Sequence, residues 1–181
     1  MAGLGYGLTR VDASVRIETL FGPESPILQD YAWIESHVGP LVPIEILVDF
    51  AADSPLSTRE RAAILARIHR TLDQNPEIGG QISALTFLPV IPRDRSLSPE
   101  AFHDEVNARL DSLRPQFAAT RMLAERPDGE TWRITARVSA LRPIHYGRFL
   151  SELNRSLEPA LRGRDGAPVP SVALRLTGIM P

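Results

Sequence analysis

Four histidines are the residues of this chain best suited to acid–base or metal chemistry, because imidazole titrates near neutral pH and ligates metals. They are His37, His69, His103 and His145, and they are widely spaced along the sequence. No pair has the spacing of a helical metal motif such as H-E-x-x-H. His103 adjoins Asp104, but adjacent helical positions point in different directions. We therefore predict surface or helix-end positions for these histidines rather than a ligand set.

Two carboxylates, Glu45 and Asp49, fall on one face of a predicted strand, on either side of Leu47. A pair of acids can perform acid–base chemistry when both are held in one site. Here they alternate with apolar residues, so we expect a solvated face or an interface instead.

Other catalytic signatures are missing from the sequence. It contains no G-x-S-x-G nucleophile elbow, no phosphate-binding loop and no cysteine. Gly3, Gly5 and Gly7 lack the strand and helix of a dinucleotide fingerprint, and Gly79-Gly80 reads as a connection between elements. We predict no catalytic, cofactor-binding or metal-binding residues, and no enzyme activity. An enzyme would require distant residues to converge, for example His145 with an Asp or Glu.

Trp33 and Trp132 are the only tryptophans in a chain that is 6% aromatic. Packing in the core is the commoner role of tryptophan, and an exposed ring at a partner surface is the alternative.

The composition is that of one ordinary globular domain. The chain has 181 residues, 43% of them hydrophobic and 23% charged, with a formal net charge of −2. All 20 basic residues are arginines, and they are scattered rather than interleaved with aromatics. This excludes a concentrated nucleic-acid surface. No apolar run reaches the roughly 18–20 residues of a membrane span, and the first residues do not resemble a signal peptide.

Four helices are predicted from start signals and apolar spacing. The first begins at Ser25-Pro26 and ends at Gly39-Pro40, with Ile27, Tyr31, Ile34 and Val38 on one face. The second begins with the capping box Ser57-Thr58-Arg59-Glu60 and ends at Asn75-Pro76. The third begins at Ser98-Pro99 and is expected to end at Pro115. The fourth runs from about Ile144 to Pro159–Gly163.

Period-two alternation predicts strands between these helices. The clearest are 43–50, 131–140 and 171–177, with weaker ones at 81–87 and 118–125. Pro127-Asp128-Gly129 is a tight-turn signature, which makes 118–140 a predicted β-hairpin.

This order predicts an α+β fold of two layers: a ferredoxin-like βαβ-βαβ antiparallel sheet with helices on one face. We expect a single domain, 1–181, in four parts. Residues 1–42 form an extended segment and helix, 43–87 the first βαβ unit, 88–125 a helical and hairpin insertion, and 126–181 the second βαβ unit.

Several segments, taken in order, resemble a known family. They are Glu18-Thr19-Leu20-Phe21-Gly22-Pro23-Glu24-Ser25-Pro26-Ile27, Asp30-Tyr31, Trp33-Ile34-Glu35, Gly39-Pro40, Val42-Pro43-Ile44-Glu45, Asn75-Pro76-Glu77-Ile78-Gly79, Ser83-Ala84-Leu85, Trp132–Val138 and Leu176-Thr177-Gly178-Ile179-Met180-Pro181. This series is similar to an extracytoplasmic loop of MMPL-like predicted exporters in the resistance–nodulation–cell division (RND) superfamily. The insertion 88–125 lies outside that pattern.

The resemblance implies a soluble periplasmic porter-type domain of a proton-driven membrane exporter, at the bacterial inner membrane. Its partners would be the second periplasmic loop and the transmembrane helices of the same transporter, and neighbouring subunits. It would help to form the export path of a hydrophobic or lipid-like substrate, and the proton-relay residues of the family lie in membrane helices. The alternative is a free-standing ferredoxin-like ligand-binding or regulatory module, which would form a symmetric oligomer with a discrete pocket.

Overall fold

The computed structural model describes residues 21–22, 24–92, 96–163, 166–169 and 171–178. These residues form an α+β fold with a five-stranded antiparallel sheet, which confirms the predicted class. The helices are α2 (Pro26–His37), α3 (Thr58–Asp73), α4 (Pro99–Ala119) and α5 (Tyr146–Leu157), with 3₁₀ turns η2 (Ala84–Phe87) and η3 (Glu158–Leu161). The strands are β1 (Val42–Ala51), β2 (Ile78–Ser83), β3 (Leu123–Arg126), β4 (Gly129–Val138) and β5 (Val172–Gly178).

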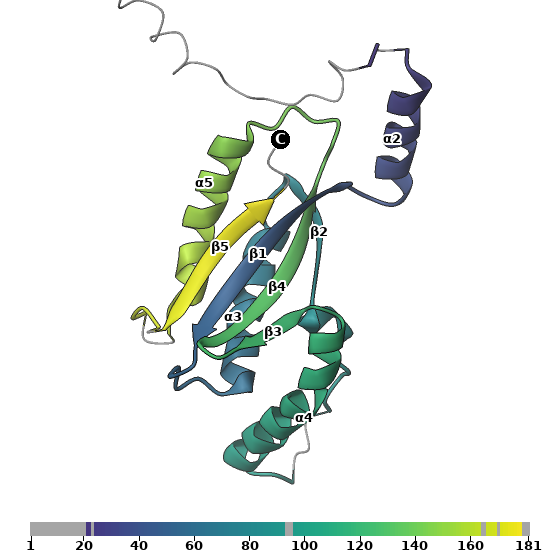
Figure 1. Cartoon of the computed structure of the whole chain (residues 1–181). Helices are drawn as coiled ribbons and strands as arrows, with labels where there is room; N and C mark the ends of the chain where they lie inside the picture. Colours follow the sequence, from purple (N-terminus) through teal and green to yellow (C-terminus); the bar gives the residue numbers. More distant parts are fainter. Residues whose placement is uncertain (1–20, 23, 93–95, 164–165, 170, 179–181) are drawn as a thin grey trace, which may run out of the picture.

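The sheet has the strand order β2-β4-β1-β5, and every neighbouring pair is antiparallel (Figure 1). β1 and β4 pair along their whole lengths, from Val42 opposite Val138 to Ala51 opposite Gly129. On the side of β4 that faces away from β1, two strands pair with it. β2 pairs with the second half of β4, and β3 pairs with its first half. The two βαβ units are therefore interleaved: β1 and β2 flank β4, while β4 and β5 flank β1.

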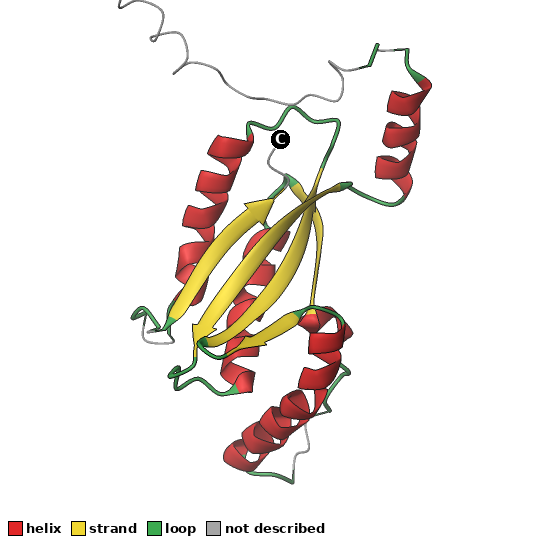
Figure 2. Ribbon diagram, viewed as in Figure 1, coloured by secondary structure: helices red, strands yellow, loops and turns green. Residues whose placement is uncertain are grey.

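One face of the sheet is apolar and covered. The even-numbered residues of β1 and β4 point to this face, as their alternation predicts, and the buried apolar ones there are Ile44, Ile46, Val48, Phe50, Trp132, Ile134, Ala136 and Val138. Helices α3 and α5 lie behind the sheet in Figure 2 and pack on this face. The front face carries no helix from the described part of the chain, and we call it the open face.

Helix α3 begins as the sequence predicts. The Ser57 side chain accepts from the Glu60 N–H, and the Glu60 carboxylate accepts from the Ser57 N–H at 2.9 Å. This reciprocal cap satisfies donors that have no partner inside the helix. The inward face of α3 carries Ile64, Leu65, Ile68 and Leu72, all of them buried.

The prediction that Pro115 ends the third helix is wrong. Helix α4 continues through Pro115 to Ala119, and the predicted strand 118–125 is reduced to Leu123–Arg126. Proline removes one helical hydrogen bond but does not forbid the helix when packing beyond it is favourable. Here Phe117, two residues further on, is buried against Trp132, with ring centroids 5.8 Å apart. Tertiary packing outweighs the local helix-breaking signal.

The predicted strand 81–87 is displaced toward the N-terminus. β2 covers Ile78–Ser83, and Ser83 then caps the 3₁₀ turn Ala84–Phe87 by accepting from the Leu85 N–H. Gly79 and Gly80 lie in this strand at a register shift. A Cβ at Gly79 would stand 2.2 Å from Pro40, so glycine there permits close approach of the segment before β1.

The predicted hairpin is confirmed, with its strands at Leu123–Arg126 and Gly129–Val138. Gly129 has φ +146°, and a Cβ there would lie 2.1 Å from the carbonyl oxygen of Phe50. Both its conformation and its neighbour therefore require glycine.

In the described ranges, no helix is both long enough and apolar enough to cross a membrane.

Candidate interaction surfaces

The structure keeps the four histidines apart. His37 ends α2, where its ring is stacked on Trp33, and it is exposed. His103 is exposed on α4, and His145 is exposed directly before α5. No group of three or more His, Cys, Asp or Glu side chains able to hold a metal ion occurs within the described ranges.

Among the described contacts of the four, His69 alone has a partner on another element, and it is half-buried within α3, so the predicted surface or helix-end position is wrong for it. Its Nε2 lies 2.8 Å from the Ser83 hydroxyl. Burial lowers the pKa of His69, and the Asp73 charge opposes that shift only in part. Ser83 is fully buried and also accepts from the Leu85 N–H, so it is not an accessible nucleophile. The pair holds α3 against the end of β2.

Asp49 is the centre of a polar network on the open face. It accepts from Arg175 of β5 at 2.6 and 3.0 Å, from Thr131 of β4 at 2.5 Å and from Arg126 of β3 at 3.2 Å. The Arg175 hydrogen bond is the main reason that the pKa of Asp49 is lowered, against a smaller opposing effect of burial. Asp49 is therefore ionised at neutral pH and ties four strands together across this face.

Glu45 lies on the same face but does not touch Asp49. It accepts from the Thr135 hydroxyl at 3.0 and 3.1 Å, and Arg133 lies 3.8 Å away. The two candidate carboxylates thus have separate partners and do not form the paired acids of an acid–base site. This face carries the carboxylates Glu45 and Asp49, and Asp128 of the β3–β4 turn pairs with Arg126 at its edge. Four arginines stand on it: Arg126, Arg133, Arg137 and Arg175. The face carries positive charge in a chain whose formal net charge is −2.

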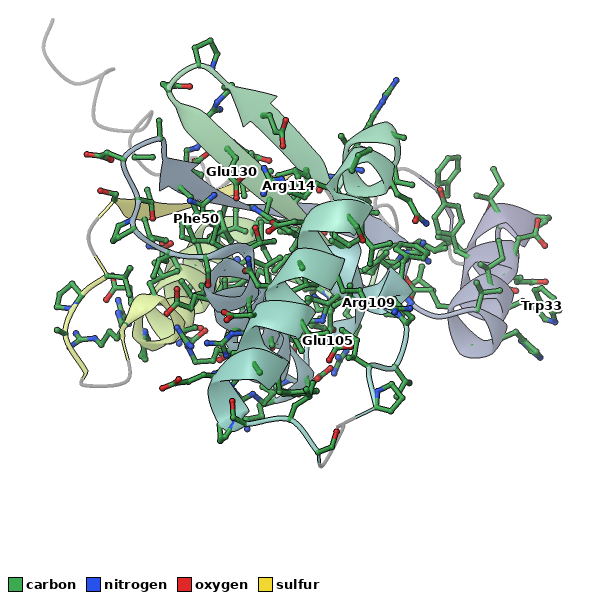
Figure 3. All side chains as sticks on the ribbon, turned by 90° about the horizontal axis from the view of Figure 1, so that it is seen from below. Trp33, Phe50, Glu105, Arg109, Arg114 and Glu130 are labelled. Atoms are coloured by element: carbon green, nitrogen blue, oxygen red, sulfur yellow. The ribbon has the colours of Figure 1, made fainter. Side chains whose placement is uncertain are left out.

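A second ionic cluster is buried where α3, α4 and β4 meet (Figure 3). Glu130, only 4% exposed, receives Arg61 at 2.7 Å, Arg114 at 2.5 Å and the Trp132 indole N–H at 2.6 Å. Arg114 also reaches Glu125, and the Arg61 guanidinium lies 5.5 Å from the centroid of the Phe50 ring. The ion pair between Arg114 and Glu130 connects helix α4, in the insertion, to the sheet.

Burial acts to raise the pKa of Glu130, but the hydrogen bonds from Arg114, Trp132 and Arg61 outweigh it and lower that pKa overall. Glu130 was not among the residues singled out from the sequence. The alternation of β4 could have identified it. Even-numbered residues of this strand such as Ile134 and Trp132 face the core, so residue 130 is expected to face the core as well. A charged residue in an inward position indicates a buried ion pair.

Helix α2 stands beside the body of the domain and has no buried residue. Glu35 attaches it to the segment after β4, accepting from the Ser139 hydroxyl at 2.6 Å and from the Ala140 N–H at 2.5 Å. The two tryptophans have opposite environments: Trp132 is fully buried, and Trp33 is 59% exposed on α2, pointing away from the body (Figure 3). Trp33 therefore fits the partner-surface alternative.

A shallow hollow of about 190 Å³ lies beside the first turns of α3. Its lining includes Arg59, Ile64 and Val169. This volume is smaller than the roughly 300–1,000 Å³ of typical small-molecule sites.

No family model matches the chain, and no curated protein matches it.

Proposed function

We propose that this chain is a periplasmic porter-type domain of an RND, MMPL-like exporter, with the ferredoxin-like plan that such domains share. The strand order carries the proposal. Two interleaved βαβ units with the order β2-β4-β1-β5, and both connecting helices on one face, match that plan. The resemblance of the ordered sequence segments supports the same assignment.

The role of the domain is mechanical rather than catalytic. It forms part of the export path for a hydrophobic or lipid-like substrate and packs against the second periplasmic loop, the transmembrane helices and neighbouring subunits. The open face supports this role, because a rigid sheet with one exposed polar face can move as a unit against a partner. The carboxylates Asp49 and Glu130 are ionised and engaged by arginines, so neither is poised as a general acid.

The native gene on both sides of this segment provides the test. We expect an apolar stretch of about 20 residues upstream of Met1 and another shortly after Pro181. A start codon and a stop codon at these ends, with no apolar stretch, would contradict the proposal and favour a free-standing binding module.

A further inference from the structure

Two polar contacts join α3 to β2 beside the apolar core. Gln81 and Ser83 lie opposite even-numbered residues of β4, so their side chains point to the face on which α3 packs. The Ser83 hydroxyl lies 2.8 Å from His69 Nε2, and the Gln81 amide donates to Asp73 at 2.6 Å. Since four helical residues and two strand residues both advance by roughly 6 Å, the two contacts form side by side.

Ser83 also organises the junction of β2 with η2. Its hydroxyl oxygen accepts from the Leu85 N–H at 3.1 Å, and its own N–H donates to the Thr86 hydroxyl at 3.1 Å. Among the described contacts, His69 Nε2 is the one acceptor for the Ser83 hydroxyl proton. Ser83 is fully buried, so water cannot replace that acceptor if it is lost.

These contacts suit a neutral imidazole. Neutral His69, with its proton on Nδ1, accepts the Ser83 hydroxyl proton at Nε2. A protonated imidazole carries a hydrogen on both nitrogens, so Nε2 becomes a donor and the buried hydroxyl proton has no acceptor. An unsatisfied buried hydroxyl is unfavourable, and the contact is therefore weaker when His69 is charged.

We infer that His69 and Ser83 form an acid-sensitive switch between α3 and the junction of β2 with η2. Protonation of His69 weakens its contact with Ser83 and loosens the end of β2 together with the η2 turn. β2 is suited to such a local opening, because it is a six-residue edge strand with a register shift between Ile78 and Gly80. The switch uses contacts within the domain, so it does not depend on the exporter proposal.

The surroundings of His69 determine the direction of the effect. Burial lowers its pKa from the ordinary 6.5, and the charge of Asp73, on the same helix, acts in the opposite direction. Neither β2 nor η2 carries an ionisable side chain. Helix α4 contacts α3 near its start, through Asp111 and Thr58, away from His69. The closed state therefore favours the neutral imidazole.

The pH range of the switch follows from this lowered pKa. The stability that the contact adds is fully present above pH 6.5 and is lost as the pH falls toward the lower folded value. This range begins well above 3.8 and 4.5, the ordinary pKa values of Asp49 and Glu130, whose folded values are lower still. The effect of His69 is thus separable from theirs.

Amide hydrogen exchange of the full 181-residue chain tests the switch, followed by NMR at pH 7 and pH 5 and corrected for intrinsic exchange rates. The Leu85 N–H is the reporter, because it donates to the Ser83 hydroxyl oxygen. We expect its protection factor to fall about ten-fold at pH 5, because the opened state binds a proton on His69 more tightly than the closed state does.

His69→Gln is the first variant, since glutamine has a carbonyl that can accept from Ser83 but does not titrate. Its Leu85 protection should be the same at both pH values. His103→Gln is the matched control, because His103 is exposed on α4. It should retain the fall in protection seen in the original chain.

Asp73→Asn tests the switch without changing the imidazole, and it keeps an oxygen that accepts from Gln81. Removing the Asp73 charge should lower the pKa of His69 further, which NMR titration of the ring measures. A pH effect on Leu85 that survives His69→Gln would overturn the inference, and so would unchanged Leu85 protection in the original chain. A higher His69 pKa in Asp73→Asn would overturn it equally.

Discussion

Glu130 is a carboxylate on which three elements depend, since Arg61 of α3, Arg114 of α4 and Trp132 of β4 all donate to it. We predict that Glu130→Gln lowers the free energy of unfolding by about 3 kcal/mol, because it leaves two half-buried guanidinium groups without their shared anion. Urea unfolding followed by circular dichroism measures this.

Glu125→Gln is the matched control, because Glu125 shares Arg114 but its side chain is 60% exposed. Its effect should stay within about 1 kcal/mol, as for other exposed ion pairs. Equal losses for the two variants would contradict the assignment of the buried cluster to Glu130.

The lowered pKa of Glu130 predicts how stability depends on pH. The stability from this group is fully present above its ordinary pKa of 4.5 and is lost as the pH falls through the lower folded value. Asp49, whose pKa is also lowered, adds to the same slope. Unfolding midpoints measured between neutral and acidic pH should therefore fall on acidification, and less steeply in Glu130→Gln. An unchanged slope in that variant would be inconsistent with the buried ion pair.

Gly129 allows a second test at single-residue resolution. Gly129→Ala should lower the free energy of unfolding by more than about 2 kcal/mol, since the residue has φ +146° and its added Cβ would meet the Phe50 carbonyl. Gly147→Ala in α5 is the control, because nothing lies within 4 Å of its Cβ position. A tolerated Gly129→Ala would show that the hairpin differs from the one described.

Among the helices, α4 contains a proline, Pro115, which should lower the free energy of unfolding. Pro115→Ala restores an N–H that can donate to the carbonyl four residues earlier, so we expect a gain of about 1 kcal/mol. Thermal unfolding measures it, with the exposed neighbour Gln116→Ala as a control for helix propensity. A lower melting temperature for Pro115→Ala would mean that proline is required at this position.

The elements with a local signal could be predicted from the sequence. The capping box of Ser57 and the alternation of 131–140 depend on neighbouring residues, and both were predicted correctly. The end of α4 and the start of β2 were predicted wrongly, because both depend on contacts between residues distant in the chain. Phe117 at the end of α4 packs against Trp132, and Gly79 at the start of β2 lies close to Pro40. Likewise, alternation placed Asp49 on the face opposite the apolar core, but Arg175 as its partner required the sheet.

For the molecule as a whole, the attachment of α2 depends on Glu35, whose charge also adds to burial in raising the pKa of Tyr146. We predict that Glu35→Gln speeds amide hydrogen exchange in residues 26–37, because the charge-assisted bonds to Ser139 and Ala140 weaken. The unfolding midpoint should change little, since α2 buries no residue. Asp30→Asn, on the same helix, is the control, and equal exchange in both variants would contradict this attachment.

The proposed function places this domain on the periplasmic side of a membrane, as part of a membrane protein. The most direct measurement is maleimide labelling of the full-length native protein in spheroplasts. Exposed Ala108 and buried Ala136 are each replaced by cysteine, since the chain has none of its own. We expect a membrane-impermeant maleimide to label Ala108→Cys but not Ala136→Cys, in protein that stays with the membrane after an alkaline wash. Labelling of Ala108→Cys only after the inner membrane is opened, or release of the protein by the wash, would contradict it.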